Sequence, residues 1–184
     1  MASTAKTLTF VIPAYNMESY LDRCVNSLLS ASDISDLEVL IVDDGSKDGT
    51  LEYARKLERT NPGAVRAIHQ ENKGHGGAVN TGIAAATGMY VKVVDADDWV
   101  DPQAIDTVLA TLRAQHDTDE PIDMLVTNYV YDKVAKRHKT VVNFRRVMEP
   151  AACSAGMTWA SSVWRSTSSC MRSPSARRWC AIPG

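Results

Sequence analysis

Apolar and polar residues follow two alternating patterns over the first 149 positions, and these patterns predict strands and helices in turn. Short runs with few polar residues are typical of strands buried on both faces of a sheet. Longer stretches with apolar residues every three or four positions are typical of amphipathic helices. The predicted strands are residues 8–12, 37–42, 65–69, 90–94, 124–131 and 139–144, and the predicted helices are residues 19–30, 49–59, 78–87 and 102–115.

This strand–helix alternation predicts an α/β fold with a Rossmann-like, mostly parallel central sheet flanked by helices. The last two strands follow each other without a helix, which favours a hairpin. Ligands of such sheets bind outside the carboxyl ends of the strands. The loops that follow the strands are therefore the place to look for chemistry.

Four successive loops carry unusual residues directly after a predicted strand. They are Pro13-Ala14-Tyr15-Asn16, Asp43-Asp44-Gly45-Ser46, residues 71–77 with Lys73, Gly74 and His75, and Asp95-Ala96-Asp97-Asp98. Each loop alone is compatible with an ordinary turn. Their convergence at one sheet edge is what predicts a cradle for a base, a ribose, a diphosphate and a counter-cation.

The fourth loop places three carboxylates within four residues at the end of a buried strand. Such carboxylates repel one another, and a divalent cation with a preference for hard oxygen ligands relieves this repulsion. Because strand side chains alternate, Asp95 and Asp97 are expected on one side, with Ala96 between them. The cluster thus predicts a Mn²⁺ or Mg²⁺ site. The structural alternative is a turn that leads into a helix capped by Asp101 before Pro102.

These four loops and residues 78–82, in this order and at this spacing, resemble family 2 glycosyltransferases over residues 8–99, about half of the chain. The resemblance implies a GT-A fold and a nucleotide-sugar donor. It implies that Pro13, Ala14, Tyr15 and Asn16 belong to the donor site, with Asp43 or Asp44 on the uracil or ribose. It further implies that Lys73 and Gly74 approach the nucleotide and sugar, and that Asp95, Ala96 and Asp97 form the D-x-D motif that holds the diphosphate through Mn²⁺ or Mg²⁺.

The implied reaction is transfer of a sugar, with inversion, from a UDP-sugar in preference to a GDP-sugar. The implied acceptor is a polysaccharide or a lipid-linked glycan, as in cell-wall or exopolysaccharide biosynthesis. Inversion needs a general base, which in this family follows the D-x-D motif, and no downstream carboxylate here stands in a recognisable motif. The candidates are Asp101, Asp106, Asp117, Asp119, Glu120, Asp123, Asp132 and Glu149.

Two other functions stay open beside the enzyme. The first is a catalytically silent module that binds a nucleotide or nucleotide-sugar, since the general base is not identifiable. The second is a nucleotidyltransferase of similar sheet architecture, which normally has a glycine- and arginine-rich loop after the first strand. Residues 13–16 do not match that loop.

Composition narrows the classes of protein. The 184 residues are 45% hydrophobic and 23% charged, as in a soluble globular domain, and the net charge of −2 argues against nucleic-acid binding. No apolar stretch approaches the roughly 20 residues needed to cross a bilayer, and residues 8–12 are too short for a signal peptide. We expect a cytoplasmic protein, with peripheral association at the inner face of the membrane still open.

Residues 150–184 differ from the rest. They contain no Asp or Glu but four Arg residues. The net charge of residues 1–149 is therefore −6, compared with −2 for the whole chain. They hold three of the four cysteines and three of the four tryptophans, without helical or strand periodicity. We therefore expect a GT-A domain over residues 1–149 and a poorly ordered, irregular tail. The tail is either a natural basic extension or, as we favour, the product of a shifted reading frame that replaced the acceptor half.

Overall fold

The computed structural model describes residues 6–116, 118–119, 121–131, 140–142, 157–164 and 169–172. The strands are β1 (Leu8–Ala14), β2 (Leu37–Asp44), β3 (Val65–Gln70), β4 (Tyr90–Val93), β5 (Met124–Tyr131), β6 (Thr140–Val142), β7 (Met157–Trp164) and β8 (Ser169–Arg172). The helices are α1 (Glu18–Leu28), α2 (Thr50–Thr60), α3 (Gly74–Ala85) and α4 (Pro102–Arg113).

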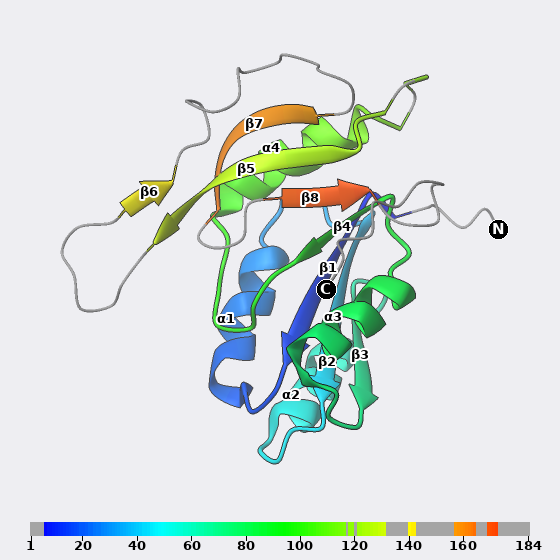
Figure 1. Cartoon of the computed structure of the whole chain (residues 1–184), viewed down its shortest axis with the longest axis vertical. Coiled ribbons are helices and arrows are strands. Elements are labelled where there is room, and N and C mark those ends of the chain that lie inside the picture. Colours follow the sequence, from blue (N-terminus) through cyan, green and yellow to red (C-terminus); the bar gives the residue numbers. More distant parts are fainter. Residues whose placement is uncertain are drawn as a thin grey trace.

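The strands form one sheet in the order β3-β2-β1-β4-β8-β5-β6, with β7 paired to β5. Strands β3, β2, β1 and β4 are parallel, and the arrowheads of β1, β2 and β3 point to one end of the molecule in Figure 1. The predicted α/β fold with a parallel central sheet is confirmed. The predicted hairpin is present as the antiparallel pair β5 and β6.

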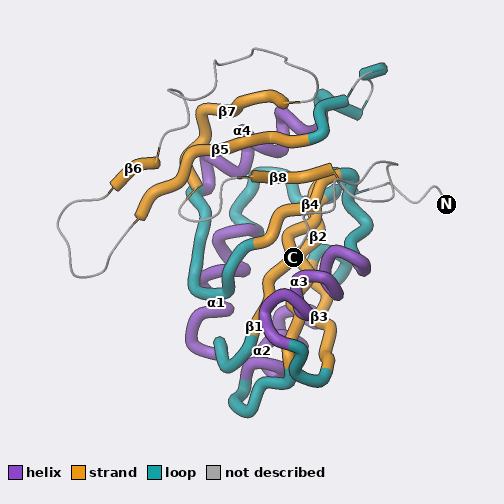
Figure 2. Tube along the Cα trace, in the orientation of Figure 1, coloured by secondary structure: helices purple, strands orange, loops and turns teal. Residues whose placement is uncertain are grey.

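Helices cover both faces of the sheet (Figure 2) because the strands are apolar on both sides. Leu8, Phe10 and Ile12 of β1 pack in one core cluster with α1, α2 and α4, whereas Val11 packs in the other with Ala78 of α3. Helix α3 approaches β1 closely, since a Cβ atom on Gly82 would lie 2.2 Å from Val11 Cγ1. The small residues of α3 therefore set the distance between this helix and the sheet.

Several boundaries differ from the sequence prediction, and three of them change the loops at the sheet edge. Strand β2 continues to Asp44, so Asp43 and Asp44 are its last two residues and not a turn. Helix α3 begins at Gly74, four residues before the predicted start, so most of the glycine-rich loop is the first turn of the helix. Strand β1 continues through Pro13 to Ala14. Its pairing with β4 covers only Leu8–Val11, so at Pro13 the strand has no partner on that side. A residue without an N–H is therefore tolerated there.

The segment after residue 149 contains two strands that its sequence pattern does not predict. Strand β8 lies between β4 and β5 and is antiparallel to both, and β7 runs parallel to β5 beside α4 (Figure 1). Backbone hydrogen bonds in such a ladder do not require alternating side chains. The other residues of the expected irregular tail lie outside the described residues. Within the described part of the chain, no helix is long and apolar enough to cross a membrane.

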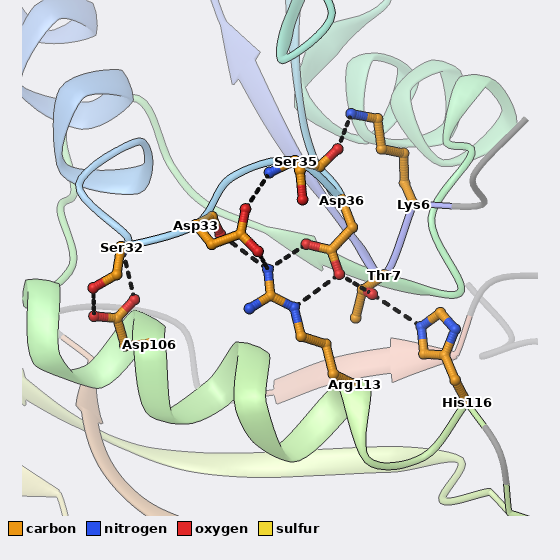
Figure 3. A network of polar contacts seen from close by, with 9 residues as sticks. All are labelled: Lys6, Thr7, Ser32, Asp33, Ser35, Asp36, Asp106, Arg113 and His116. Atoms are coloured by element: carbon orange, nitrogen blue, oxygen red, sulfur yellow. Dashed lines mark hydrogen bonds and ion pairs between the residues drawn. The ribbon is translucent and has the colours of Figure 1, made fainter.

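A polar network joins the amino-terminal ends of β1 and β2 to the end of α4 (Figure 3). The Nε atom of Arg113 donates to Asp36 Oδ2 at 2.9 Å, and Nη2 of the same guanidinium donates to Asp36 Oδ1. The hydroxyl of Thr7 also donates to Asp36 and lies 2.9 Å from His116 Nε2. This network lies at the end of the sheet opposite to the loops that carry the candidate chemistry.

Candidate functional site

A cleft of about 510 Å³ opens at the carboxyl ends of the parallel strands. It lies between the loops after β1 and β4, where the strand order reverses, which is the ligand-binding position of α/β sheets. Its lining residues come from the four loops singled out in the sequence and from the residues beside them. They are Pro13, Tyr15, Met17, Asp44, Asn72, Gly74, His75, Ala78, Asp95, Ala96 and Asp97.

The acidic loop forms a turn, and it presents two carboxylates to the cleft. The N–H of Asp98 donates to the carbonyl of Asp95 at 2.9 Å, Asp95 is half-buried and Asp97 is exposed. The cap of α4 is made by another residue, since Asp101 Oδ1 accepts from the N–H groups of Gln103 and Ala104. The turn and the helix cap of the structural alternative are therefore both present, and the cap is made by a different residue from the two that line the cleft.

Helix α1 lies against this turn. The thiol of Cys24 is buried and donates to the carbonyl of Asp95 at 3.7 Å. Burial raises the pKa of Cys24 to about 12, with further contributions from the carboxylates of Asp98, Asp97 and Asp95. The thiol therefore stays protonated and is a packing group, not a nucleophile.

The two neighbouring carboxylates of the second loop have different surroundings. Asp43 is fully buried and does not line the cleft; its Oδ2 lies 2.7 Å from His69 Nδ1 and its Oδ1 accepts from the N–H of Ser46. Asp44 lines the cleft. Burial raises the pKa of Asp44, but hydrogen bonds from the Lys73 N–H and the Gln70 amide outweigh it, so the pKa lies below its ordinary value. Asp44 is thus also buried, at 2% exposed, but it lines the cleft, and its pKa is held below the ordinary value.

Four predicted donor-site residues do not line the cleft: Ala14, Asn16, Asp43 and Lys73. Asn16 instead joins two loops, because its Oδ1 accepts from the Lys47 N–H at 2.8 Å and its own N–H donates to Ser46 Oγ. Its φ of 55° is one that Asn adopts more readily than most residues. Lys73 acts through its backbone, whose N–H donates to Asp44 at 2.8 Å.

Four lining residues are not among the predicted site residues: Met17, Asn72, His75 and Ala78. Asn72 and His75 flank the predicted Lys73 and Gly74, so their place in the loop was a usable signal. Ala78 follows from the early start of α3, which brings its first turns to the cleft. Met17 carries no sequence signal, since an apolar residue before a helix usually belongs to the core.

The carboxylates at the cleft suit a hard divalent cation only when a bound diphosphate supplies further oxygen ligands. Among the described residues, no three His, Cys, Asp or Glu side chains gather as a metal cluster. Asp95 and Asp97, which both carry carboxylates, nevertheless line the same cleft. Mg²⁺ is commonly bound by one or two carboxylates, with water and substrate phosphates as its other ligands. The residues present therefore fit an ion that arrives with a diphosphate.

Comparison with known proteins gives relatives of one kind. Residues 9–149 match the model of Glycosyl transferase family 2. A chondroitin synthase of Escherichia coli is 42% identical over 106 residues, which are 58% of this chain and 15% of that protein. TarS 1–349 of S. aureus in complex with UDP-GlcNAc has a TM-score of 0.59 and 27% identity over 72% of this chain and 36% of that one.

A third relative is the mannosyltransferase PcManGT from Pyrobaculum calidifontis, solved in complex with GDP-Man and Mn²⁺. It has a TM-score of 0.55 and 26% identity, over 67% of this chain and 35% of that one. The chain thus spans between about a seventh and about a third of the length of these relatives. The matched region contains every loop that lines the cleft, and on this evidence the chain belongs to glycosyltransferase family 2.

Proposed function

We propose that the cleft binds the nucleoside diphosphate of a UDP-sugar, and that the chain transfers the sugar with inversion to a polysaccharide or lipid-linked acceptor. The observation that carries the proposal is the lining of the cleft, where an aromatic ring, an ionised Asp44 and the paired Asp95 and Asp97 face one space. Tyr15, 41% exposed, has a face on which a base can stack. The complex of TarS with UDP-GlcNAc supports a UDP-sugar, and the complex of PcManGT with GDP-Man supports a nucleotide-sugar donor in general.

Asp95 and Asp97 are the residues that would hold Mn²⁺ or Mg²⁺ in this proposal. When bound, the ion would supply positive charge beside the diphosphate leaving group, whose negative charge grows as the bond between the sugar and the diphosphate breaks. Asp44 and its neighbours orient the nucleoside. The chain's own contribution to this half of the reaction is therefore the binding and alignment of the donor.

A second candidate function is a nucleotide-sugar-binding module without transferase activity. It is favoured by the positions of the described downstream carboxylates. Asp101 caps α4, and Asp106 accepts hydrogen bonds from Ser32. None of the described candidates lines the cleft, namely Asp101, Asp106, Asp119 and Asp123. The other candidates for the general base, at positions 117, 120, 132 and 149, lie outside the described residues.

Calorimetry with the full chain tests the proposal. UDP should bind more tightly in Mn²⁺ than in EDTA, and more tightly than GDP, CDP or ADP in the same buffer. Donor hydrolysis and transfer, measured separately, distinguish the enzyme from the silent module. Absence of UDP binding under both conditions would contradict both candidate functions, whereas binding without turnover would support the module.

The second loop gives a prediction that separates ligand contact from folding. Asp44→Ala should weaken UDP binding about tenfold, because a hydrogen bond to a charged group contributes roughly 1.5–3 kcal/mol. Asp43→Ala should leave UDP affinity unchanged. Both substitutions should lower the free energy of unfolding by about 2 kcal/mol, since Asp43 is a buried partner of Ser46 N–H and His69, and Asp44 is a buried partner of Gln70 and Lys73 N–H. Calorimetry and urea unfolding of both variants check this, and equal affinities in the wild type and Asp44→Ala would exclude the loop from the site.

A further inference from the structure

Helix α1 contacts the backbone of the acidic turn at two points, one before Asp97 in the sequence and one after it. Before Asp97, the thiol of Cys24 donates to the carbonyl of Asp95. After it, the hydroxyl of Ser27 accepts from the N–H of Val100 at 3.1 Å. Ser27 lies three positions after Cys24 and four positions after Arg23, and both spacings make side chains neighbours on a helix surface.

Ser27 links the backbone of the helix to the backbone of the turn. Its Oγ donates to the carbonyl of Cys24 at 2.7 Å while it accepts from Val100. This carbonyl contact fixes the direction of the hydroxyl, and Val100 is itself buried in the core. A buried N–H that lost this acceptor would have to move in order to find another.

Arg23 holds the adjacent residue through its ring. The guanidinium carbon lies over the Trp99 ring, 3.2 Å from its centre, which is a cation–π contact. Arg23 is exposed, and Trp99 follows the last carboxylate of the turn directly. The contact therefore fixes the place where the chain leaves the acidic cluster.

We propose that Ser27 and Arg23 are positioning residues for the carboxylates of Asp95 and Asp97. They hold the turn so that both side chains face the same part of the cleft before a cation and a diphosphate arrive. This inference rests on the proposed function of the cleft, and it adds that α1 determines how well the turn binds the cation. Neither residue lines the cleft, so each acts through the turn.

A purely electrostatic role for Arg23 predicts the opposite result. A guanidinium beside carboxylates opposes the binding of a cation, so its removal would lower the Mn²⁺ concentration needed for half-saturation. Loss of a positioning contact raises that concentration. The direction of the change in Arg23→Gln therefore distinguishes the two roles.

The experiment compares Ser27→Ala and Arg23→Gln with two matched controls in the full chain. Ser27→Thr keeps the hydroxyl, and Arg55→Gln removes an exposed guanidinium from α2. In the presence of UDP, calorimetry gives the half-saturating Mn²⁺ concentration, and UDP affinity in EDTA is measured alongside. Hydrogen exchange of the amides of residues 98–100 reports the turn itself without metal.

Ser27→Ala and Arg23→Gln should each raise the half-saturating Mn²⁺ concentration roughly tenfold, as groups that support metal ligands do. UDP affinity in EDTA should stay unchanged, the controls should match the wild type, and exchange at residues 98–100 should quicken in Ser27→Ala. Unchanged Mn²⁺ dependence or unchanged exchange in Ser27→Ala would overturn the inference while leaving the proposed function intact. A lower half-saturation in Arg23→Gln would overturn the role of Arg23, and a wild type without metal dependence would overturn both proposals.

Discussion

Asp97→Asn should abolish the difference between UDP affinity in Mn²⁺ and UDP affinity in EDTA. Asp97 is exposed, lines the cleft and carries one of the two carboxylates of the D-x-D turn that face it. An amide keeps the shape of the side chain but is neutral and a weaker ligand for a hard cation. In the proposed site the cation is held jointly by the carboxylates and the diphosphate, so loss of one carboxylate should lower the Mn²⁺-dependent affinity about tenfold or more.

The control is Asp119→Asn, which removes the same charge from an exposed position that does not line the cleft. Its UDP affinity should equal that of the wild type with and without Mn²⁺. The free energy of unfolding of Asp97→Asn should also be unchanged, since exposed substitutions usually have small effects. If Asp97→Asn kept the full Mn²⁺ dependence, the acidic loop would be a turn only, and the cation site would have to lie elsewhere.

The fold was predictable because the strands and helices have distinct hydrophobic periods. Residues of α1 with apolar spacing, such as Leu21, Val25 and Leu28, are all buried as expected. The start of α3 was missed because glycine is a poor helix former, so Gly74, Gly76 and Gly77 indicate a loop by local preference. Their inclusion in the helix depends on tertiary packing, which a local pattern does not contain.

The position of the site was predictable because parallel strands bring their carboxyl ends to one edge. The separate roles of Asp43 and Asp44 were not, since the two have the same side chain and adjacent positions. Only the structure shows that one pairs with His69 in the interior while the other faces the cleft. Asn16 is a similar case, because its contacts with Ser46 and Lys47 join residues 30 and 31 positions apart.

The contacts of α1 with the acidic turn were beyond sequence reasoning for the same reason. Ser27 and Val100 are 73 residues apart, and neither belongs to a motif. Arg23 and Trp99 are likewise 76 residues apart, and nothing in their local sequence indicates that they meet. Side chains that act by supporting a site through its backbone therefore carry little signal in the local sequence.

The second large effect is expected in stability, at the other end of the sheet. The Arg113 guanidinium lowers the pKa of Asp36 from 3.8 to about 2, against burial and with help from the Thr7 hydroxyl. A carboxylate whose pKa is lower in the folded chain stabilises it above its ordinary pKa, and this contribution disappears as the pH falls through about 2. The shift corresponds to about 2 kcal/mol at neutral pH, of which about half remains at pH 3.

Asp36→Asn should therefore lower the free energy of unfolding by about 2 kcal/mol at pH 6, and the gap to the wild type should narrow as the pH falls. Urea unfolding at pH 6, 4 and 3 measures this. Asp33→Asn is the matched control, because Asp33 pairs with the same Arg113 but is 58% exposed, so its effect should be much smaller. UDP affinity should be unchanged in both variants, since the network lies opposite to the cleft. A constant gap at all three pH values would show that Asp36 acts through hydrogen-bond geometry alone, without its charge.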